Sequence, residues 1–252
     1  MKIQYIILAV ILLILVILSI PFFSEDKTSA LFEAARLGNI EKVKKLIYNG
    51  ADYNARNEKG ITVLMTAAVT DHPEIVKLLL DKGAPINVKN NSGSTALMYI
   101  ADKGHPDVVK LLIQNGADIN EKNEYGWTAL LIAALNGHVE AVKLLIDAGA
   151  DINAREVNTG STATMIANNK GHGDVVKLLV ESGALINDKD KNGVTVLMVA
   201  ADKGFTETVK LLIKNGADVN MKDNNGWTAL KLAEKKNHTE IVNLLKDAGA
   251  KE

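Results

Sequence analysis

GWTALLIAALNGHVEAVKLLIDAGADIN, residues 126–153, contains the pattern on which the whole chain is built. It reads as a short helix, a turn, a longer helix and a looped exit. The hydroxyl of Thr128 is placed to cap the first helix, and Asn136-Gly137 breaks that helix after about two turns. Gly149 supplies the left-handed residue that ends the second helix. A helix pair this small and apolar cannot bury both faces alone, so it needs a copy of itself on each side.

The copies are present at a fixed period. The glycine after each long helix recurs every 33 or 34 residues, at Gly50, Gly83, Gly116, Gly149, Gly183, Gly216 and Gly249. The opening block of the short helix also recurs, as TVLMTA (62–67), TALMYI (95–100), TALLIA (128–133), TATMIA (162–167), TVLMVA (195–200) and TALKLA (228–233). This period and this block resemble the ankyrin-repeat family, whose signature contains T-P-L-H-x-A. The Pro and the His of that signature are absent here, so we expect somewhat softer helix caps on the same fold.

The resemblance implies an all-α ankyrin-repeat solenoid of seven helix pairs, which follows an N-terminal transmembrane helix. We divide the chain into a signal-anchor helix (1–24), a linker (25–28) and a repeat domain (29–252). The expected repeats cover about 29–60, 61–93, 94–126, 127–160, 161–193, 194–226 and 227–252. Charged residues such as Glu33 and Lys236 make the two terminal repeats polar on their outer faces, as the solubility of a solenoid requires.

The first residues predict a membrane anchor. Between Ile3 and Phe23 there is no charged residue, and a helix of that length spans ~31 Å, close to the hydrocarbon thickness of a bilayer. The run is longer than the ~7–15 residues of a signal peptide's hydrophobic region, and no A-x-A-like site follows it. We expect an uncleaved, single-pass anchor; the alternative is secretion after cleavage.

The flanking charges predict how the anchor is oriented. Lys2 and the α-amino group precede the span, so the N-terminus is expected in the cytoplasm and the repeats outside it. The richness in Lys, Asn and Ile is typical of a bacterial protein, for which the repeats would be periplasmic.

Composition and motifs argue against catalysis, metal binding and nucleic-acid binding. The net charge of −1, without a basic face, argues against nucleic acid, and the absence of cysteine excludes disulfides and thiolate metal sites. All five histidines share one repeat position, where the family uses histidine to bind backbone between helices. One asparagine at each repeat exit is expected to tie its loop to the next repeat. We therefore expect no enzyme activity, no catalytic residue, no cofactor, no metal and no small-molecule substrate.

The surface that the repeat leaves free is the candidate site. In the family, finger tips and the exposed ends of the short helices line a concave groove that binds partners. Aromatic anchors inside a polar rim are typical of binding hot spots, and Tyr125, Trp127 and Leu135 form the best such cluster. The partner-binding residues expected in this chain are Lys103, Tyr125, Trp127, Leu135, Asn136, Asn169, Lys170, Lys203 and Trp227.

One repeat, 161–193, departs from the pattern. A residue is inserted in the preceding finger, between Arg155 and Thr159, and Thr164 replaces a core leucine. Asn168-Asn169 introduces polar side chains where an alanine is usual. Polar atoms at core positions predict that this repeat is the least stable joint of the solenoid.

These observations favour a membrane-tethered interaction module. Its groove would hold another protein in the cell envelope, in an assembly, protection or immunity role. The alternative is a passive spacer without a specific groove ligand, which would not need an exposed aromatic cluster.

Overall fold

The structure is a computed structural model that describes residues 27–251 and consists there of seven helix pairs stacked side by side. That part of the chain contains no β-strand, only two isolated β-bridges, Arg56 with Thr62 and Arg155 with Thr162. The expected transmembrane helix lies outside the described residues. Among those that are described, no helix is long and apolar enough to cross a membrane.

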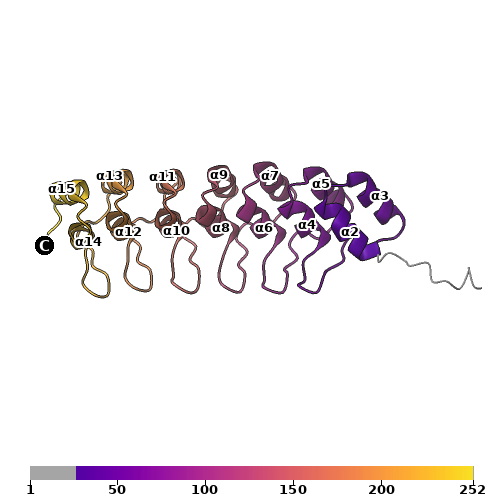
Figure 1. Cartoon of the computed structure of the whole chain (residues 1–252), viewed down its shortest axis with the longest axis horizontal. Coiled ribbons are helices and arrows are strands. Elements are labelled where there is room, and N and C mark those ends of the chain that lie inside the picture. Colours follow the sequence, from indigo (N-terminus) through magenta and orange to yellow (C-terminus); the bar gives the residue numbers. More distant parts are fainter. Residues whose placement is uncertain (1–26, 252) are drawn as a thin grey trace, which may run out of the picture.

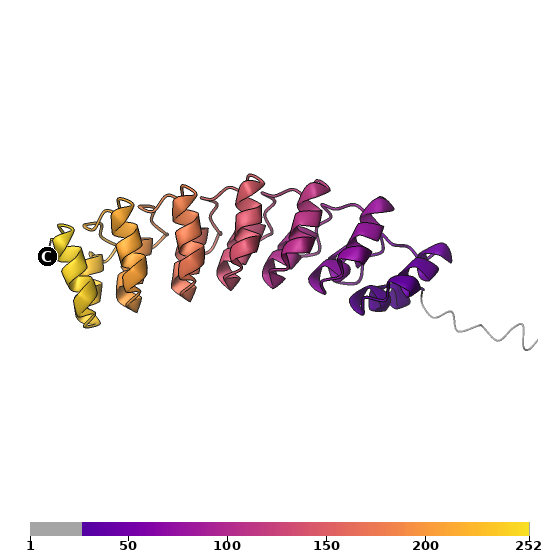
Figure 2. The ribbon, with the colours of Figure 1, turned by 90° about the horizontal axis from the view of Figure 1, so that it is seen from above.

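The short first helices form one layer and the longer second helices form another, while the loops project from one side as fingers (Figure 1). The stack curves gently along its length (Figure 2). The first helices are α2 (Lys27–Arg36), α4 (Val63–Val69), α6 (Ala96–Lys103), α8 (Ala129–Asn136), α10 (Ala163–Lys170), α12 (Val196–Lys203) and α14 (Ala229–Lys235). The second helices are α3 (Ile40–Tyr48), α5 (Pro73–Asp81), α7 (Pro106–Gln114), α9 (Val139–Asp147), α11 (Gly173–Glu181), α13 (Thr206–Lys214) and α15 (Thr239–Asp247).

Helix α2 is already present at Lys27, so the last two residues of the expected linker belong to the first helix. The remaining expected helices appear where the repeat pattern placed them. Helix α8 ends at Gly137 with φ +76°, and Gly149 follows α9 with φ +88°, as the sequence predicts.

The threonine that opens each block caps its helix. From α4 to α14, the Oγ1 atom of this threonine accepts a hydrogen bond from the backbone N–H three residues later, and each threonine is buried. Methionine occupies the His position of the signature in several repeats. At α4 and α12 its sulfur accepts a bond from the cap residue's own N–H, over 3.4 Å from Thr62 to Met65 and from Thr195 to Met198. Sulfur is a weak acceptor, but it restores part of the missing capping interaction.

A continuous apolar core runs the length of the stack. Each first helix packs on the first helices of the neighbouring repeats, and each second helix does the same in its own layer. Alanine, valine and leucine dominate this core, with fully buried side chains such as Leu97, Leu130 and Leu145. Since contacts are only between neighbours, stability is distributed along the array as a sum of repeat and interface terms.

Five of the six exit asparagines tie neighbouring repeats together, as predicted, whereas the side chain of Asn54 makes no such bond within the described residues. Asn87, Asn120, Asn187 and Asn220 each donate a side-chain N–H to the glycine carbonyl after the next long helix and accept the N–H two residues beyond that glycine. Asn153 makes the second of these bonds, to Leu185. In the first repeat the hydroxyl of Tyr53 donates to the carbonyl of Lys82 instead.

Four of the five histidines also join repeats through the backbone. The Nε2 atoms of His72, His138, His172 and His238 lie 3.0–3.2 Å from carbonyl oxygens at the end of the preceding repeat's first helix. These contacts confirm the structural role expected for the histidines. His105 differs, because its Nδ1 lies 3.2 Å from the carboxylate of Asp71.

Candidate partner-binding groove

Most fingers are built around one Asn or Asp side chain. In five of the six fingers its Oδ1 accepts backbone N–H bonds from the residues two and four positions later; these residues are Asn57, Asn90, Asn123, Asp190 and Asp223. This arrangement closes a tight turn at each finger tip. One side-chain oxygen of each of these residues is thereby used to hold the backbone of its finger.

The finger before α10 is one residue longer and uses a longer side chain. Glu156 takes the place of the Asn or Asp, and its carboxylate accepts N–H bonds from Asn158 (2.7 Å), Thr159 (2.6 Å) and Ser161 (3.3 Å). The hydroxyl of Thr159 donates to the same carboxylate. Glu156 is only 5% exposed. Burial raises the pKa of this carboxyl, but the four hydrogen bonds outweigh it and hold the pKa of Glu156 below its usual value.

Adjacent fingers are joined into a ladder. One backbone bond links each tip to the next, for example from Val157 N–H to the carbonyl of Tyr125 and from Lys191 N–H to the carbonyl of Thr159. At the finger bases, Arg155 donates to the carbonyls of Gly160 and Lys189 and pairs with Asp188 at 2.5 Å. The long finger is therefore held on both sides rather than free at the surface.

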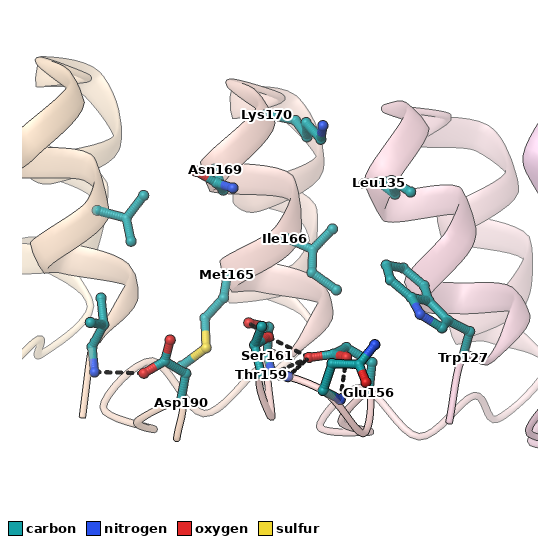
Figure 3. Close-up of a pocket in the computed structure, with 13 residues that line it drawn as sticks. Trp127, Leu135, Glu156, Thr159, Ser161, Met165, Ile166, Asn169, Lys170 and Asp190 are labelled. Carbon is teal, nitrogen blue, oxygen red and sulfur yellow. Dashed lines mark hydrogen bonds between the residues drawn. The ribbon is translucent and has the colours of Figure 1, made fainter. Parts of the chain in front are cut away.

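Beside the long finger, the groove deepens into a cavity of about 470 Å³. Figure 3 shows the apolar side chains of Trp127, Met165 and Ile166 between Lys170 at one edge and the finger side chains at the other. The full lining is Trp127, Leu135, Glu156, Asn158, Thr159, Ser161, Met165, Ile166, Asn169, Lys170, Asp190, Val194 and Val199. We call this space the groove cavity. It joins three consecutive repeats, because α8, α10 and α12 all contribute.

The structure brings four of the nine expected partner-binding residues together in this cavity: Trp127, Leu135, Asn169 and Lys170. Trp127 and Leu135 are half-buried, while Asn169 and Lys170 are exposed. Lys170 has no ion pair with any residue in 27–251, so its charge faces the groove unneutralised.

The other five expected residues do not line the groove cavity. Tyr125 is 53% exposed on the finger beside it, and Lys203 is exposed at the end of α12. The side chain of Asn136 donates to Ile132 and Asp102, Lys103 pairs with Asp102 at 2.9 Å, and Trp227 lies under the ammonium of Lys235 at 4.7 Å. The sequence predicts one cluster of Tyr125, Trp127 and Leu135; in the structure only the last two share the cavity.

Comparison with known protein families matches three segments of the chain, residues 31–123, 119–190 and 185–252, to ankyrin repeats. Together these segments cover nearly all of the described residues. The chain belongs to the ankyrin-repeat family. Ankyrin repeats generally mediate protein–protein interaction, and the family generally consists of non-enzymatic scaffolds.

Two curated proteins match a short segment of this chain. Mitochondrial disaggregase from Bos taurus is 50% identical over 44 residues, and that from Homo sapiens is 48% identical over 44 residues. In both comparisons the match covers 18% of this chain and 6% of the relative. A segment of 44 residues is little longer than one 33-residue repeat of this chain, so the match concerns only a small part of either protein.

Several lining residues were not among the expected site residues. Met165 takes the His position of the repeat signature, and Ile166 and Val199 take its variable x position; Ile166 is 8% exposed at the cavity floor. Glu156 and Asp190 shape the two fingers at its edge. The sequence signal that could have found this place is the inserted residue in the finger 155–159, which distinguishes this repeat from the others.

Proposed function

We propose that this protein is a membrane-tethered interaction module whose concave groove holds a segment of another protein. The observation that carries the proposal is the groove cavity, which combines a half-buried tryptophan, an apolar floor and an unpaired lysine in one concave space. Aromatic and aliphatic anchors enclosed by polar groups are typical of the energetic centre of a protein interface. Membership of a family that generally binds proteins supports the same conclusion.

The lining defines the chemistry of the partner. Trp127 and Ile166 offer an apolar surface to one large aliphatic or aromatic side chain. Lys170 stands at the edge, where a carboxylate of the partner would complete an ion pair. The partner segment that fits best therefore carries a large apolar residue next to Asp or Glu.

The proposed location is the cell envelope. The uncharged run between Ile3 and Phe23 would anchor the protein in the membrane, with its N-terminus in the cytoplasm and the repeats outside. The partner would then be an envelope protein that this module assembles, protects or neutralises. A passive spacer, with no specific ligand in the groove, is the alternative.

Capture from detergent-solubilised membranes tests the groove. The native chain is compared with a Trp127→Ala/Lys170→Ala variant and with a matched convex-side variant, Lys110→Ala/Lys177→Ala. Lys110 and Lys177 are exposed on the second helices α7 and α11, away from the groove cavity. Circular dichroism checks that all three retain the same helix content.

The proposal expects one protein to be recovered with the native chain and the convex-side variant but lost with the groove variant. Equal recovery by all three would place binding elsewhere and refute the groove. Failure of all three to retain any specific protein would favour the spacer.

Membrane topology is tested separately, using the absence of native cysteine. A single-cysteine chain, Gln114→Cys, is treated with a membrane-impermeant maleimide in intact and in permeabilised cells. Modification in intact cells would support the proposed orientation, whereas modification only after permeabilisation would reverse it.

A further inference from the structure

The first repeat carries an exposed tyrosine beside the point where the chain leaves the proposed anchor. Tyr48, at the end of α3, is 91% exposed, which is more than any other large hydrophobic residue in 27–251. The Nζ atom of Lys27 lies 3.0 Å from the carbonyl oxygen of Asn49, the next residue. The start of α2 and the end of α3 are therefore at the same end of this helix pair.

Chain length keeps this end near the membrane surface. Only Ser24, Glu25 and Asp26 separate the proposed span from Lys27, and four residue steps reach at most about 14 Å. Because Lys27 contacts Asn49, Tyr48 is held within a short distance of the lipid headgroups whenever the anchor is inserted. Tyrosine is enriched at that depth, where its ring meets the acyl boundary and its hydroxyl meets water.

The charges around Tyr48 are suited to anionic lipid. Residues 27–50 contain five basic and two acidic side chains, whereas the whole chain has a net charge of −1. Lys44 and Lys45 lie four and three residues before Tyr48, on the same side of α3. Lys44 pairs with Glu41 at 2.8 Å, but Lys45 has no ion pair with a described residue and is exposed. The other exposed large hydrophobic residue of this repeat, Leu37, follows the opposite end of α2.

We propose that Tyr48 and the lysines beside it, Lys27, Lys44 and Lys45, form a contact surface for the headgroups of an anionic bilayer. This inference rests on the membrane tether of the proposed function. The contact fixes the first repeat against the bilayer and so sets the direction in which the groove is presented. It needs no partner protein, because the bilayer is the surface next to which the tether holds this end.

The test uses the full chain reconstituted into vesicles of phosphatidylcholine, with or without phosphatidylglycerol. Tyr48→Trp places a fluorescent reporter at the proposed contact, and Tyr125→Trp places a matched one at an exposed tyrosine in the middle of the array. The native chain, with Trp127 and Trp227, supplies the background emission. Lipids brominated near the headgroup serve as a quencher, and flotation after an alkaline wash reports whether the chain is integral. Both insertion directions place the first repeat against a leaflet, so random orientation does not affect the result.

We expect the emission of the reporter at position 48 to shift to shorter wavelength and to be quenched, more strongly with phosphatidylglycerol. The reporter at position 125 should behave as background. Lys45→Ala, added to the Tyr48→Trp chain, should lower the ratio of reporter in contact with the membrane to reporter in water. We expect a decrease of about fivefold, the equivalent of about 1 kcal/mol for one surface lysine. Lys110→Ala, on α7, should leave that ratio unchanged. Added salt should weaken the contact without releasing the chain.

The two failures are distinguishable. If the chain floats after the alkaline wash but the reporter at position 48 is no more quenched than the one at position 125, the bilayer contact is overturned while the tether stands. If the chain does not float, the tether itself is wrong, and the contact proposed here fails with it.

Discussion

The α-carbon of Gly104 lies directly against the imidazole of His138 in the next repeat. A Cβ atom added to Gly104 would stand 2.3 Å from two atoms of that ring, and its backbone has φ +75°. Gly38, Gly137 and Gly204 contact the histidines of their following repeats in the same way. The glycine and the histidine therefore form one inter-repeat joint, in which the small residue makes room for the large one.

Gly104→Ala should destabilise this joint. The left-handed backbone and the overlap with His138 together predict a loss of about 2–4 kcal/mol in the free energy of unfolding. Gly173→Ala is the matched control, since it lies in the first turn of α11 with no heavy atom within 4 Å of the added Cβ. There we expect a gain of about 0.4–1 kcal/mol. Urea denaturation checks both, and equal effects of the two variants would contradict this role for the glycine.

The irregular repeat should be the weakest joint, and the structure supplies a reason. Within 27–251, two buried side-chain polar atoms lack a hydrogen-bond partner, Oγ1 of Thr164 and Oδ1 of Asn168. Both residues are 1% exposed, and they lie one turn apart on α10. Each such atom costs about 1–3 kcal/mol. Backbone hydrogen exchange in α10 should accordingly be faster than in α8 and α12; equal protection would refute this.

Thr164 is smaller than its counterpart Leu130 in the preceding repeat, and Asn168 is larger than its counterpart Ala134, so the two side chains together fill a similar volume. Thr164→Leu alone overfills the site, and Asn168→Ala alone leaves a gap and frees the carbonyl of Val196, to which the Asn168 amide donates at 3.0 Å. The double variant also frees the Val196 carbonyl, but it removes both unsatisfied atoms and restores the Leu and Ala pair of the neighbouring repeats, so it should be more stable than native by about 1–3 kcal/mol. A double-mutant cycle should give a coupling above about 0.5 kcal/mol. Simple additivity of the two single variants would contradict this interpretation.

Glu156 should make the long finger sensitive to acid. Its pKa is held below the unfolded value, so the stability it contributes is present above an ordinary glutamate pKa of about 4.3 and is lost as pH falls through the folded value. Glu156→Ala leaves the N–H groups of Asn158, Thr159 and Ser161 without their acceptor and should cost about 1–3 kcal/mol. Hydrogen exchange of the finger between neutral and acidic pH measures both effects.

Two variants control this experiment. Glu156→Gln keeps an acceptor oxygen but cannot titrate, so the finger should lose its acid dependence. Asp190→Asn puts into the next finger the residue that Asn57, Asn90 and Asn123 already provide, and should change stability by less than about 0.5 kcal/mol. An unchanged acid response in Glu156→Gln would show that another group is responsible.

The repeat architecture could be derived from the sequence because the same helix-pair pattern recurs seven times. Gly149 and Thr128 have counterparts at a constant period, so each turn and cap is confirmed by its copies. The exit asparagines were predictable for the same reason, and Asn87 or Asn220 make the expected bonds. Departures such as the Asp71–His105 pair could not be foreseen, because the residue at the glycine position decides which contact the next histidine makes.

The groove cavity was only partly predictable. Trp127 and Lys170 were placed in the groove by their repeat positions, and both line the cavity. Ile166 was not among the expected residues, because it stands at the variable x position of the signature and the repeat pattern does not reveal which of these side chains lines a cavity. The inserted residue was visible in the sequence. The role of Glu156 in holding the longer turn was not, because it depends on hydrogen bonds from residues two to five positions later.

Site-specific photocrosslinking tests most directly whether the concave groove holds another protein. A photoreactive amino acid is introduced at Asn169, which is exposed and lines the groove cavity, and separately at Lys177, exposed on α11. After irradiation of intact cells, we expect a discrete crosslinked protein from position 169 and none from position 177. A crosslink from position 177 alone, or from neither position, would contradict the groove as the binding surface.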